Sequence, residues 1–332
     1  MRTTELVQRR ASGRGVMLGI DVGGSGSRAA IIPVDGGRRR QISGPRTSVG
    51  AGGSRVPELV RTLIDEAAEA WPHDLANVAG IGIGATGLAS LVESPADLVA
   101  DLAHETGAPV VAAIDAVTAH LGALSGDGGA VVALGTGAIA IGHPGMSPAG
   151  SCPPHWRRVD GWGHLLGDRG GGAWVGRRAL EQALRAHDGV DTAGIALLGA
   201  GRERFGDPRD WPVQLYTRAD RAGVLAEFAA DVVSLARSGD PASVRLLTEA
   251  GEEAAQSALA ALAPGYPAEV VLTGGLVRAG GALERGFRQQ IASHPGEVHV
   301  RRPCGEPVDG SLMLAQMSAA GRAESQEGFV WT

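Results

Sequence analysis

The segment of residues 17–32, MLGIDVGGSGSRAAII, constrains the fold most, because it predicts two strands joined by a turn of glycine and serine. Glycine lets the chain turn sharply and lets a ligand approach the backbone. Successive free N–H groups in such a turn form an anion-binding hollow. Asp21, at the end of the first strand, could hold hydrated Mg²⁺, which prefers one or two carboxylates plus phosphate oxygens. The segment is either a phosphate-binding hairpin or an ordinary Gly-rich hairpin.

The same pattern returns later in the chain. An apolar run at residues 130–134 is followed by a turn and by a second apolar run at residues 138–142. The turn consists of Gly135, Thr136 and Gly137. This repetition suggests an internal duplication. Two such turns could hold one polyphosphate from both sides, and the alternative is two unrelated hairpins.

Strands alternate with helices between and after the two hairpins, which predicts an α/β fold with a mixed sheet. The expected elements are strands at residues 78–83, 110–114 and 269–272 and helices at residues 56–70, 96–105 and 116–124, with a long helical region at 174–263. Asp115 stands between a strand and a helix. It could cap the helix, or it could act as a general base toward a hydroxyl group. Its position alone favours the cap.

Composition excludes several classes of function. The net charge is −6, so nucleic acid is not an expected partner. All 30 basic residues are Arg, which excludes the phosphate loop that ends in Lys and excludes Lys Schiff-base chemistry. The two cysteines have no metal-ligand spacing, and we find no signal peptide and no apolar run of ~20 residues that could span a membrane. We therefore expect a cytoplasmic protein, with residues 1–15 as a disordered arm.

Two further Gly-rich segments are candidate ligand sites. In residues 160–176, DGWGHLLGDRGGGAWVG, Trp162 offers a flat apolar surface to a sugar, and Asp168 could accept hydrogen bonds from hydroxyl groups. So many glycines are costly in conformational entropy, which indicates a purpose, although a flexible loop before a helix is the alternative. In residues 270–276, VVLTGGL, a buried strand leads to two glycines that fit close approach to adenosine.

Taken in order, GIDVGGSGS, AIDA, LGTGA, GWGHLLGDRGGGAWVG, LTGGL and EPVDGSLMLA resemble the BadF/BadG/BcrA/BcrD ATPase family. Within it the chain is most similar to the branch of N-acetylglucosamine kinases and glucosamine kinases, in particular those of the actinobacterial type. The resemblance implies the fold of actin, Hsp70 and sugar kinases, with two ribonuclease-H-like lobes and an interlobe cleft. The expected N-terminal lobe is residues 16–118 with a returning C-terminal helix at 308–332, and the expected C-terminal lobe is residues 119–307.

The resemblance also implies roles for single residues. Asp115 matches the catalytic base that takes the proton of the sugar 6-hydroxyl, which reverses the preference for a helix cap, and Asp21 matches the aspartate on the Mg²⁺ side. The other matched positions are Gly24, Ser25, Gly26 and Ser27 in the first phosphate turn, Gly135, Thr136 and Gly137 in the second, Gly274 and Gly275 beside adenosine, and Thr136, Gly161, Trp162 and Asp168 around the sugar. The implied reactants are ATP with Mg²⁺ and an amino sugar, and relatives often form homodimers.

Departures from the family pattern bear on the substrate. N-acetylglucosamine kinases continue the second turn as Thr-Gly-Ser-Asn, where this chain has Ala138 and Ile139 after Gly137. They also usually carry Asn in the loop that here spans residues 46–49. Asn can both donate to and accept from an acetamido group, whereas a free 2-amino group is a cation that needs acceptors or a carboxylate. We therefore predict glucosamine as the substrate and glucosamine 6-phosphate as the product, with N-acetylglucosamine as the alternative.

The tail at residues 324–332 is unusually apolar for a terminus, with Phe329 and Trp331 near its end. Docking of these two rings could bring Glu327 or the Thr332 carboxylate close to the amino group of the sugar. This is a hypothesis about the group that binds the 2-amino position.

Two rival classes have less support in the sequence. An activator ATPase of radical dehydratases would need cysteines that hold an iron–sulfur cluster, and Cys152 and Cys304 match no such motif. A non-catalytic sugar-responsive regulator would need a DNA-binding helical domain, which the short N-terminal arm cannot form.

Overall fold

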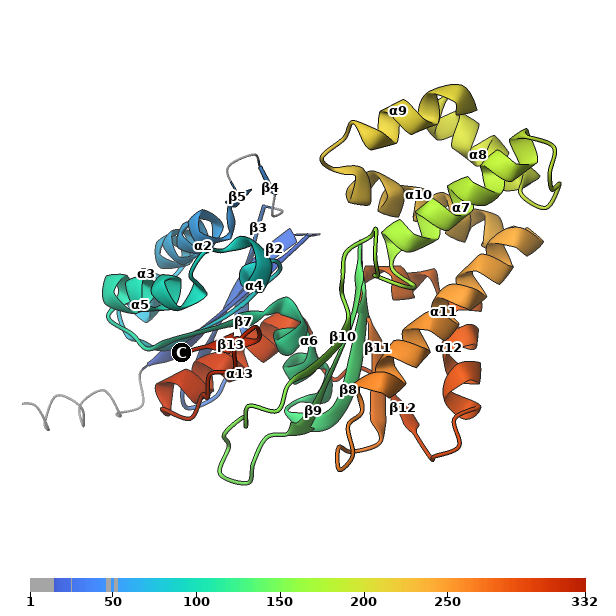
Figure 1. Ribbon diagram of the computed structural model, residues 1–332. Coiled ribbons are helices and arrows are strands. Elements are labelled where there is room, and N and C mark those ends of the chain that lie inside the picture. The colour runs from blue at the N-terminus through green and yellow to red at the C-terminus, as the bar shows by residue number, and fades with distance from the viewer. Residues whose placement is uncertain (1–14, 25, 46–48, 51–52) are drawn as a thin grey trace, which may run out of the picture.

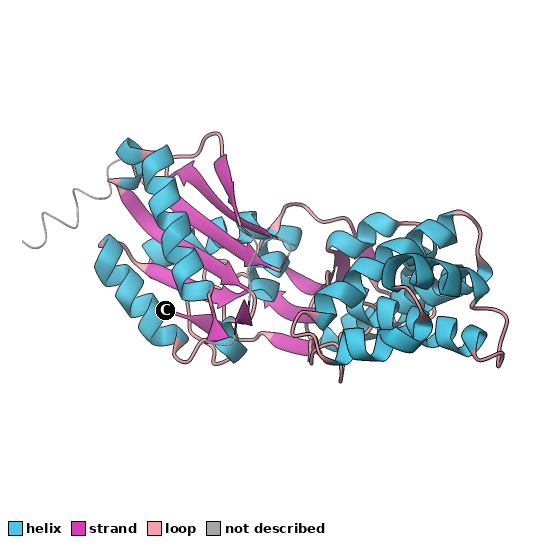
Figure 2. Cartoon of the chain, turned by 90° about the horizontal axis from the view of Figure 1, so that it is seen from above, coloured by secondary structure: helices cyan, strands magenta, loops and turns pink. Residues whose placement is uncertain are grey.

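The computed structural model describes residues 15–332 apart from residues 25, 46–48 and 51–52. The expected N-terminal arm therefore lies outside the described residues, except for Gly15. Two large sheets, each flanked by helices, make up most of the molecule (Figures 1 and 2). In the described part of the chain, none of the helices has both the length and the apolar character needed to cross a membrane.

The first sheet has the strand order β13-β7-β6-β1-β2-β3. In chain order its members are β1 (Val16–Gly23), β2 (Gly26–Pro33), β3 (Arg40–Gly44), β6 (Val78–Ala85), β7 (Val110–Ile114) and β13 (Val330–Trp331). Strands β1, β6 and β7 are parallel to one another, so their carboxyl ends meet at one edge of the sheet. Strands β2, β3 and β13 run antiparallel to their neighbours.

The second sheet, with the order β10-β9-β8-β11-β12, repeats this plan. Its strands are β8 (Asp127–Leu134), β9 (Ala138–Gly145), β10 (Arg157–Asp160), β11 (Glu269–Thr273) and β12 (His299–Arg301). In both sheets a hairpin continues into a third antiparallel strand on one side, and two parallel strands follow on the other side. The repeated strand order agrees with the internal duplication that the two Gly-rich hairpins suggested. A separate two-stranded sheet joins β4 (Val49–Gly50) and β5 (Gly53–Ser54).

Helices cover both sheets. Those near the first sheet are α2 (Val56–Ala70), α3 (Pro72–Leu75), α4 (Leu88–Leu91), α5 (Pro95–Thr106) and α13 (Pro307–Ala319). Those near the second are α7 (Gly172–His187), α8 (Ile195–Phe205), α9 (Trp211–Tyr216), α10 (Arg221–Arg237), α11 (Pro241–Ala261) and α12 (Ala282–Ala292), with short 3₁₀ turns η1 (Pro208–Asp210) and η2 (Gly275–Ala279). Helices α2 and α5 share a buried cluster with one face of the first sheet, and α13 packs on its other face.

Helix α6 (Asp115–Leu124) lies between the two sheets (Figure 1). Its Val117 and Leu121 belong to a buried cluster that also contains Ala113 of the first sheet and Val131 of the second. Helix α13 approaches α6 so closely that a Cβ atom on Gly310 would lie 1.9 Å from the Thr118 carbonyl oxygen. The predicted boundary between the lobes, after residue 118, falls inside α6.

The predicted elements agree with the structure in the strongly patterned parts of the chain. Helix α2 and strand β7 have the predicted bounds. Strands β10 and β13 were not predicted. The returning C-terminal segment expected at residues 308–332 is helical as far as Ala319. The last residues instead fold back, and β13 pairs with the edge of the first sheet.

Candidate active site

Three parallel strands bring three polar residues to one edge of the first sheet. Asp21 lies near the end of β1, Thr86 directly follows β6, and Asp115 directly follows β7. The Thr86 N–H donates to the Val22 carbonyl at 2.9 Å, which extends the pairing of β1 and β6 to this point. Ligands of open α/β sheets bind at the carboxyl ends of parallel strands. This edge is therefore the candidate active site.

Asp115 is the first residue of α6, and Ile114 before it is still extended, with φ −61° and ψ 148°. Burial raises the pKa of the Asp115 carboxyl group, whereas hydrogen bonds from the Thr86 side chain and the Ala116 N–H lower it. The net direction is upward. The positive end of the helix also favours the carboxylate. A fixed carboxylate with a raised pKa is suited to accept a proton from a hydroxyl group.

We expect Thr86→Val to shift the acid limb of the profile of kcat/KM against pH to higher pH. The Thr86 hydrogen bond lowers the Asp115 pKa, so its loss raises this pKa, and more of the enzyme is protonated and inactive at low pH. Activity at pH 8 should change least. Thr62→Val is the control, because the Thr62 hydroxyl donates at 2.9 Å to a carbonyl of its own helix, α2. An unchanged acid limb in Thr86→Val would contradict this role.

Asp21 is 8% exposed, and its pKa is raised to about 7. Burial is the main cause, followed by the charge of Asp115. Arg28, directly opposite Asp21 on β2, acts in the other direction and lowers the pKa. Glu306, which forms an ion pair with Arg28 at 3.6 Å, raises the pKa of Asp21. Asp21 is therefore a buried carboxylate whose negative charge is only partly balanced by the protein.

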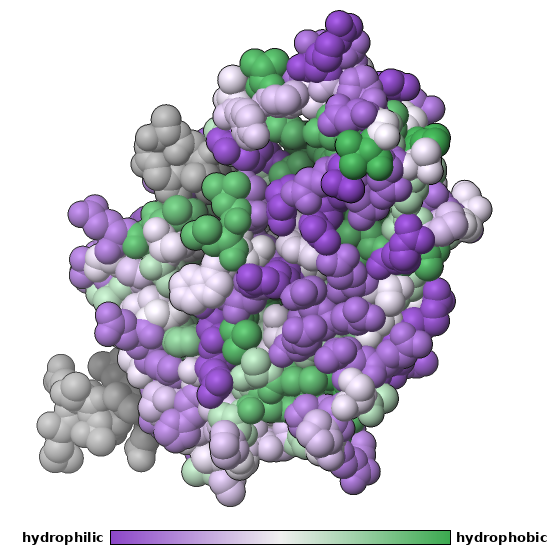
Figure 3. All heavy atoms as spheres, turned by 45° about the vertical axis from the view of Figure 1, so that its right-hand side comes forward, coloured by the Kyte–Doolittle hydropathy of each residue, from purple (hydrophilic) through white to green (hydrophobic). Residues whose placement is uncertain are grey.

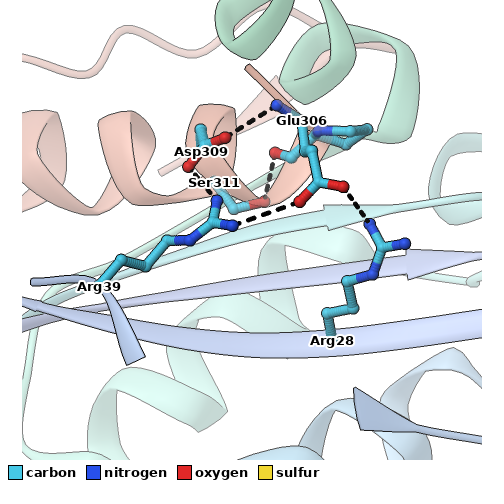
Figure 4. A network of polar contacts seen from close by, with 6 residues as sticks. Arg28, Arg39, Glu306, Asp309 and Ser311 are labelled. Atoms are coloured by element: carbon cyan, nitrogen blue, oxygen red, sulfur yellow. Dashed lines mark hydrogen bonds and ion pairs between the residues drawn. The ribbon is translucent and has the colours of Figure 1, made fainter. Parts of the chain in front are cut away.

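A polar network fixes the beginning of α13 beside this hairpin (Figure 4). Arg39 forms ion pairs with Asp309 and, at 3.3 Å, with Glu306. The Asp309 carboxylate also accepts the Glu306 N–H at 2.8 Å, as part of a capping box. Ser311 donates its hydroxyl hydrogen to the Ile20 carbonyl at 2.9 Å. These contacts hold α13 against the strand that carries Asp21.

The second Gly-rich turn joins β8 and β9. The Gly135 N–H donates to the Gly137 carbonyl at 2.9 Å, and Thr136 is exposed. The beginning of α7 supports the turn, because the Gly172 N–H donates to Gly135 at 2.9 Å and the Ala173 N–H donates to Thr136 at 2.8 Å. The sequence therefore predicted this turn correctly, and its carbonyl groups are held by the helix that follows the Gly-rich segment.

Asp168 ties the Gly-rich segment to the second turn. Its carboxylate accepts the Gly163 N–H at 3.0 Å and a backbone hydrogen bond from Ala138, and burial raises its pKa. Asp160 is 6% exposed and accepts the Asp168 N–H at 2.8 Å. Both aspartates adopt positive φ, at 60° for Asp160 and 55° for Asp168. Such backbone conformations persist where the surroundings enforce them, often at ligand sites.

We expect Gly137→Ala to lower kcat/KM at least tenfold. A Cβ atom there would lie 2.4 Å from an Asp168 carboxylate oxygen, so the turn and the Gly-rich segment would have to separate. Gly199→Ala is the matched control, because Gly199 is exposed in α8 and an added Cβ would meet nothing within 4 Å. Equal kinetics for the two variants would show that the contact is unimportant.

The remaining predicted sugar and adenosine residues lie around the same turn. Gly161 has φ 75°, and a Cβ there would lie 3.0 Å from Ile139. Trp162 is 63% exposed, and the Arg158 guanidinium lies 4.4 Å from the centre of its ring. Gly274 has φ 107°, and an added Cβ would lie 2.2 Å from the carbonyl oxygen that precedes Gly135. Gly275, the next residue, begins η2.

The first Gly-rich turn is described only in part. Gly24 is exposed and an added Cβ there would meet nothing within 4 Å, and Gly26 has φ 157°. Ser25 lies outside the described residues, as do residues 46–48 of the loop that bears on N-acetyl recognition. Ser27 is buried, and its hydroxyl donates to the Pro45 carbonyl at 2.7 Å. The Ser27 side chain therefore ties the hairpin to the residue that follows β3.

Sequence reasoning missed three residues that organise the site: Thr86, Arg28 and Asp160. Thr86 follows the strand next to the one that leads to Asp115, and the order of the predicted strands could have shown this. Arg28 faces Asp21 across the hairpin, which the hairpin register could have shown. Asp160 had no signal of its own, because its role depends on the unexpected positive φ of two residues.

Two other observations bound the site. Within the described residues, no group of three or more His, Cys, Asp or Glu side chains could hold a metal ion by itself. A separate open concavity of about 600 Å³ lies beside α7 and α8 and contains none of the residues discussed above. Its Arg209 is already paired with Asp207 at 2.7 Å. We place the chemistry at the strand edge and not in this concavity, because the strand edge gathers the buried carboxylates.

Comparison with known proteins bears on the family to which the chain belongs. The family model for the BadF/BadG/BcrA/BcrD ATPase family matches residues 18–315. The N-acetylmuramic acid/N-acetylglucosamine kinase of Clostridium acetobutylicum is 26% identical over 90% of this chain and 98% of its own length. A solved structure from Chromobacterium violaceum, named as a candidate N-acetylglucosamine kinase, is 29% identical, covers 91% of this chain and 99% of its own, and has a TM-score of 0.63.

A glucokinase of the ROK family from Streptomyces griseus, solved with glucose and AMPPNP, has a TM-score of 0.57 at 18% identity, over 91% of this chain and 99% of its own. At that identity the likeness concerns the fold alone. It confirms the prediction of an α/β fold with two lobes of the actin, Hsp70 and sugar-kinase type. The match over nearly the whole chain also confirms the family resemblance, and the chain belongs to the BadF/BadG/BcrA/BcrD ATPase family.

Proposed function

We propose that this protein is an ATP-dependent sugar kinase that transfers the γ-phosphoryl group to the 6-hydroxyl of glucosamine. The observation that carries the proposal is the position of Asp115, which begins α6 at the carboxyl edge of the first sheet beside Thr86 and Asp21. Asp115 is the general base that orients the 6-hydroxyl and accepts its proton. Phosphoryl transfer depends mainly on such positioning and on charge stabilisation.

The phosphates of ATP are assigned to the two Gly-rich turns. In the first turn we assign the phosphates to backbone N–H groups and not to the Ser27 hydroxyl, because that hydroxyl already donates to the Pro45 carbonyl beyond β3. In the second, Thr136 is exposed and has both a hydroxyl and a backbone N–H to offer. Gly274 and Gly275 allow the adenosine to approach the end of β11. Because the chain has no Lys, Arg28 is the cation assigned to the first turn.

The buried carboxylate of Asp21 fits the requirements of Mg²⁺. Its charge is poorly balanced by the protein, as the raised pKa shows, and Mg²⁺ that arrives with ATP needs only one or two carboxylates. Bound Mg²⁺ would supply positive charge to the phosphates. Asp21 would hold it, directly or through water, and the charge of Arg28 would favour the ionised form of Asp21.

The choice of glucosamine is supported by chemistry around the sugar segment. Ala138 and Ile139 stand where an acetamido-binding Asn would be expected, and Ile139 packs against Gly161. Among the described residues of this segment, the half-buried carboxylate of Asp168 can accept further hydrogen bonds, whereas both oxygens of the buried Asp160 carboxylate already accept the N–H groups of Asp168 and Arg169. A carboxylate favours a 2-ammonium group over a neutral acetamide. Trp162 supplies the apolar surface for the ring of the sugar.

N-acetylglucosamine is the second candidate, because both relatives with the higher sequence identities carry that sugar in their names. Release of ADP measured with glucosamine, N-acetylglucosamine, glucose and mannosamine at equal concentrations separates the two. The proposal predicts the highest kcat/KM for glucosamine. A preference for N-acetylglucosamine would overturn the substrate assignment but leave the kinase assignment intact.

A further inference from the structure

The last ten residues contact two segments that lead into the candidate active site, and we call residues 323–332 the C-terminal strap. Its strand β13 pairs with β7 and completes the edge of the first sheet. The Phe329 carbonyl accepts the Ile114 N–H at 3.0 Å, and Ile114 immediately precedes Asp115. Val330 is 4% exposed and shares a buried cluster with β7 and α6. The strap therefore holds the backbone directly before the proposed base.

The direction of the strap corrects the hypothesis that the terminal carboxylate reaches the sugar. Pairing is antiparallel, with Trp331 opposite Ala112, whereas Phe329 lies beside Ile114. The chain thus runs away from Asp115 toward the beginning of β7. The Thr332 carboxylate lies toward the opposite end of that strand.

The same strap also forms hydrogen bonds with the residue that precedes β10, the strand that leads into the Gly-rich sugar segment. The Gln326 side chain accepts the Trp156 N–H at 2.8 Å, and its Nε2 donates to the Trp156 carbonyl at 2.9 Å. Trp156 immediately precedes β10, whose last residue is Asp160. A parallel bridge between Ala323 and Cys152 adds a second contact to this segment. One amide side chain thus joins the C-terminus to the strand before the Gly-rich segment.

The Trp156 ring makes this attachment firm. It is 5% exposed, stacks on His143 of β9 with ring centres 4.0 Å apart, and meets the edge of His120 at 5.1 Å. His120 belongs to α6, the helix that begins at Asp115. Trp156 is therefore connected to Asp115 by two routes. Its ring contacts His120 of α6, and its backbone is hydrogen-bonded to the strap, whose strand β13 pairs with β7.

We propose that Gln326 is a positioning residue, through which the C-terminal strap fixes the Asp115 segment relative to the sugar-binding segment that begins at Asp160. This inference rests on the proposed function, which assigns these two segments to the same sugar. Among the described residues, the strap's hydrogen bonds go to β7, to residues 152–156 and to the strap itself. The two phosphate turns are not among these direct partners, so we expect the main effect on the sugar side of the reaction.

The first test compares Gln326→Met with Ser325→Ala. Gln326→Met keeps the length of the side chain and removes both hydrogen bonds to Trp156, whereas Ser325→Ala removes only the contacts of Ser325 with Thr332 inside the strap. We expect Gln326→Met to lower kcat/KM for the sugar roughly fivefold to thirtyfold, with KM for ATP unchanged. Ser325→Ala should keep both constants. Loss of active protein with unchanged constants in the remainder would mean a merely structural role and overturn the proposal.

The second test is hydrogen exchange in the same proteins, and it does not depend on activity. Gln326→Met should speed exchange in residues 157–163 and 110–116 together, and Ser325→Ala should not. Faster exchange in the strap alone, or in both segments without any kinetic change, would overturn the proposal. If the wild-type protein phosphorylates no sugar, the proposed function fails by itself, and the exchange data still decide whether the strap couples the two segments.

Discussion

Asp115→Asn is expected to lower kcat roughly a thousandfold, the scale of a lost general base, while the sugar still binds. The amide keeps the size of the side chain and can still meet Thr86, but it cannot take the proton of the 6-hydroxyl. Single-turnover measurements give the rate of the chemical step, and calorimetric titration gives the affinity for the sugar.

Asp160→Asn is a useful comparison for this variant. The Asp160 carboxylate organises the sugar segment, because it accepts the N–H groups of Asp168 and Arg169, both at 2.8 Å. Unlike Asp115, it lies at the end of β10 and not after β7. It should mainly weaken sugar binding, so its effect falls on KM. If Asp115→Asn retained a tenth of the wild-type kcat, a different group would have to be the base.

Asp21→Asn should abolish activity with Mg²⁺ and ATP and yet stabilise the free protein at pH 8. The folded state holds the Asp21 proton up to a pKa of about 7, whereas the ordinary value is 3.8. The folded state therefore binds more protons than the unfolded state between these values, and stability falls as pH rises through this range. Above pH 7 the ionised Asp21 lowers the free energy of unfolding by its full amount, at most roughly 4 kcal/mol. Asp21→Asn removes this destabilisation, so the Tm at pH 8 should rise by several degrees.

The pH dependence separates this effect from other causes. Near pH 4 the gain from Asp21→Asn should shrink toward zero, because the carboxyl group is then protonated in the fold. Asp35→Asn, in the exposed turn after β2, should change the Tm little at either pH. Adding Mg²⁺ with ATP should stabilise the wild-type protein more than Asp21→Asn. A gain at pH 8 that persisted unchanged at pH 4 would contradict the explanation.

The parts of the fold that depend on local pattern could be predicted from the sequence. Helical periodicity and Pro57 located α2, and a continuous apolar run located β7 and hence the place of Asp115. The Gly-rich turn at residues 135–137 was recognised because glycine and apolar strands signal a hairpin within a few residues. These features are set by short-range preferences.

The missed features depend on partners that are distant in the sequence. Strand β10 has the sequence RRVD, which has little strand character, and it forms because β9 offers a free edge. Strand β13 forms only because β7, more than two hundred residues earlier, needs an edge partner. The two hydrogen bonds between the Gln326 side chain and the Trp156 backbone also arise only in the folded chain, as does the contact of Asp168 with Gly137. Patterns along the chain carry no record of such contacts.

The most direct measurement of the central claim is phosphorus NMR of a mixture of the protein, Mg²⁺, ATP and glucosamine. We predict the stoichiometric appearance of glucosamine 6-phosphate and ADP with the wild-type protein, and no detectable sugar phosphate on the same timescale with Asp115→Asn. Release of inorganic phosphate without any phosphorylated sugar, or equal product from the two proteins, would contradict the assignment of Asp115 as the base of a sugar kinase.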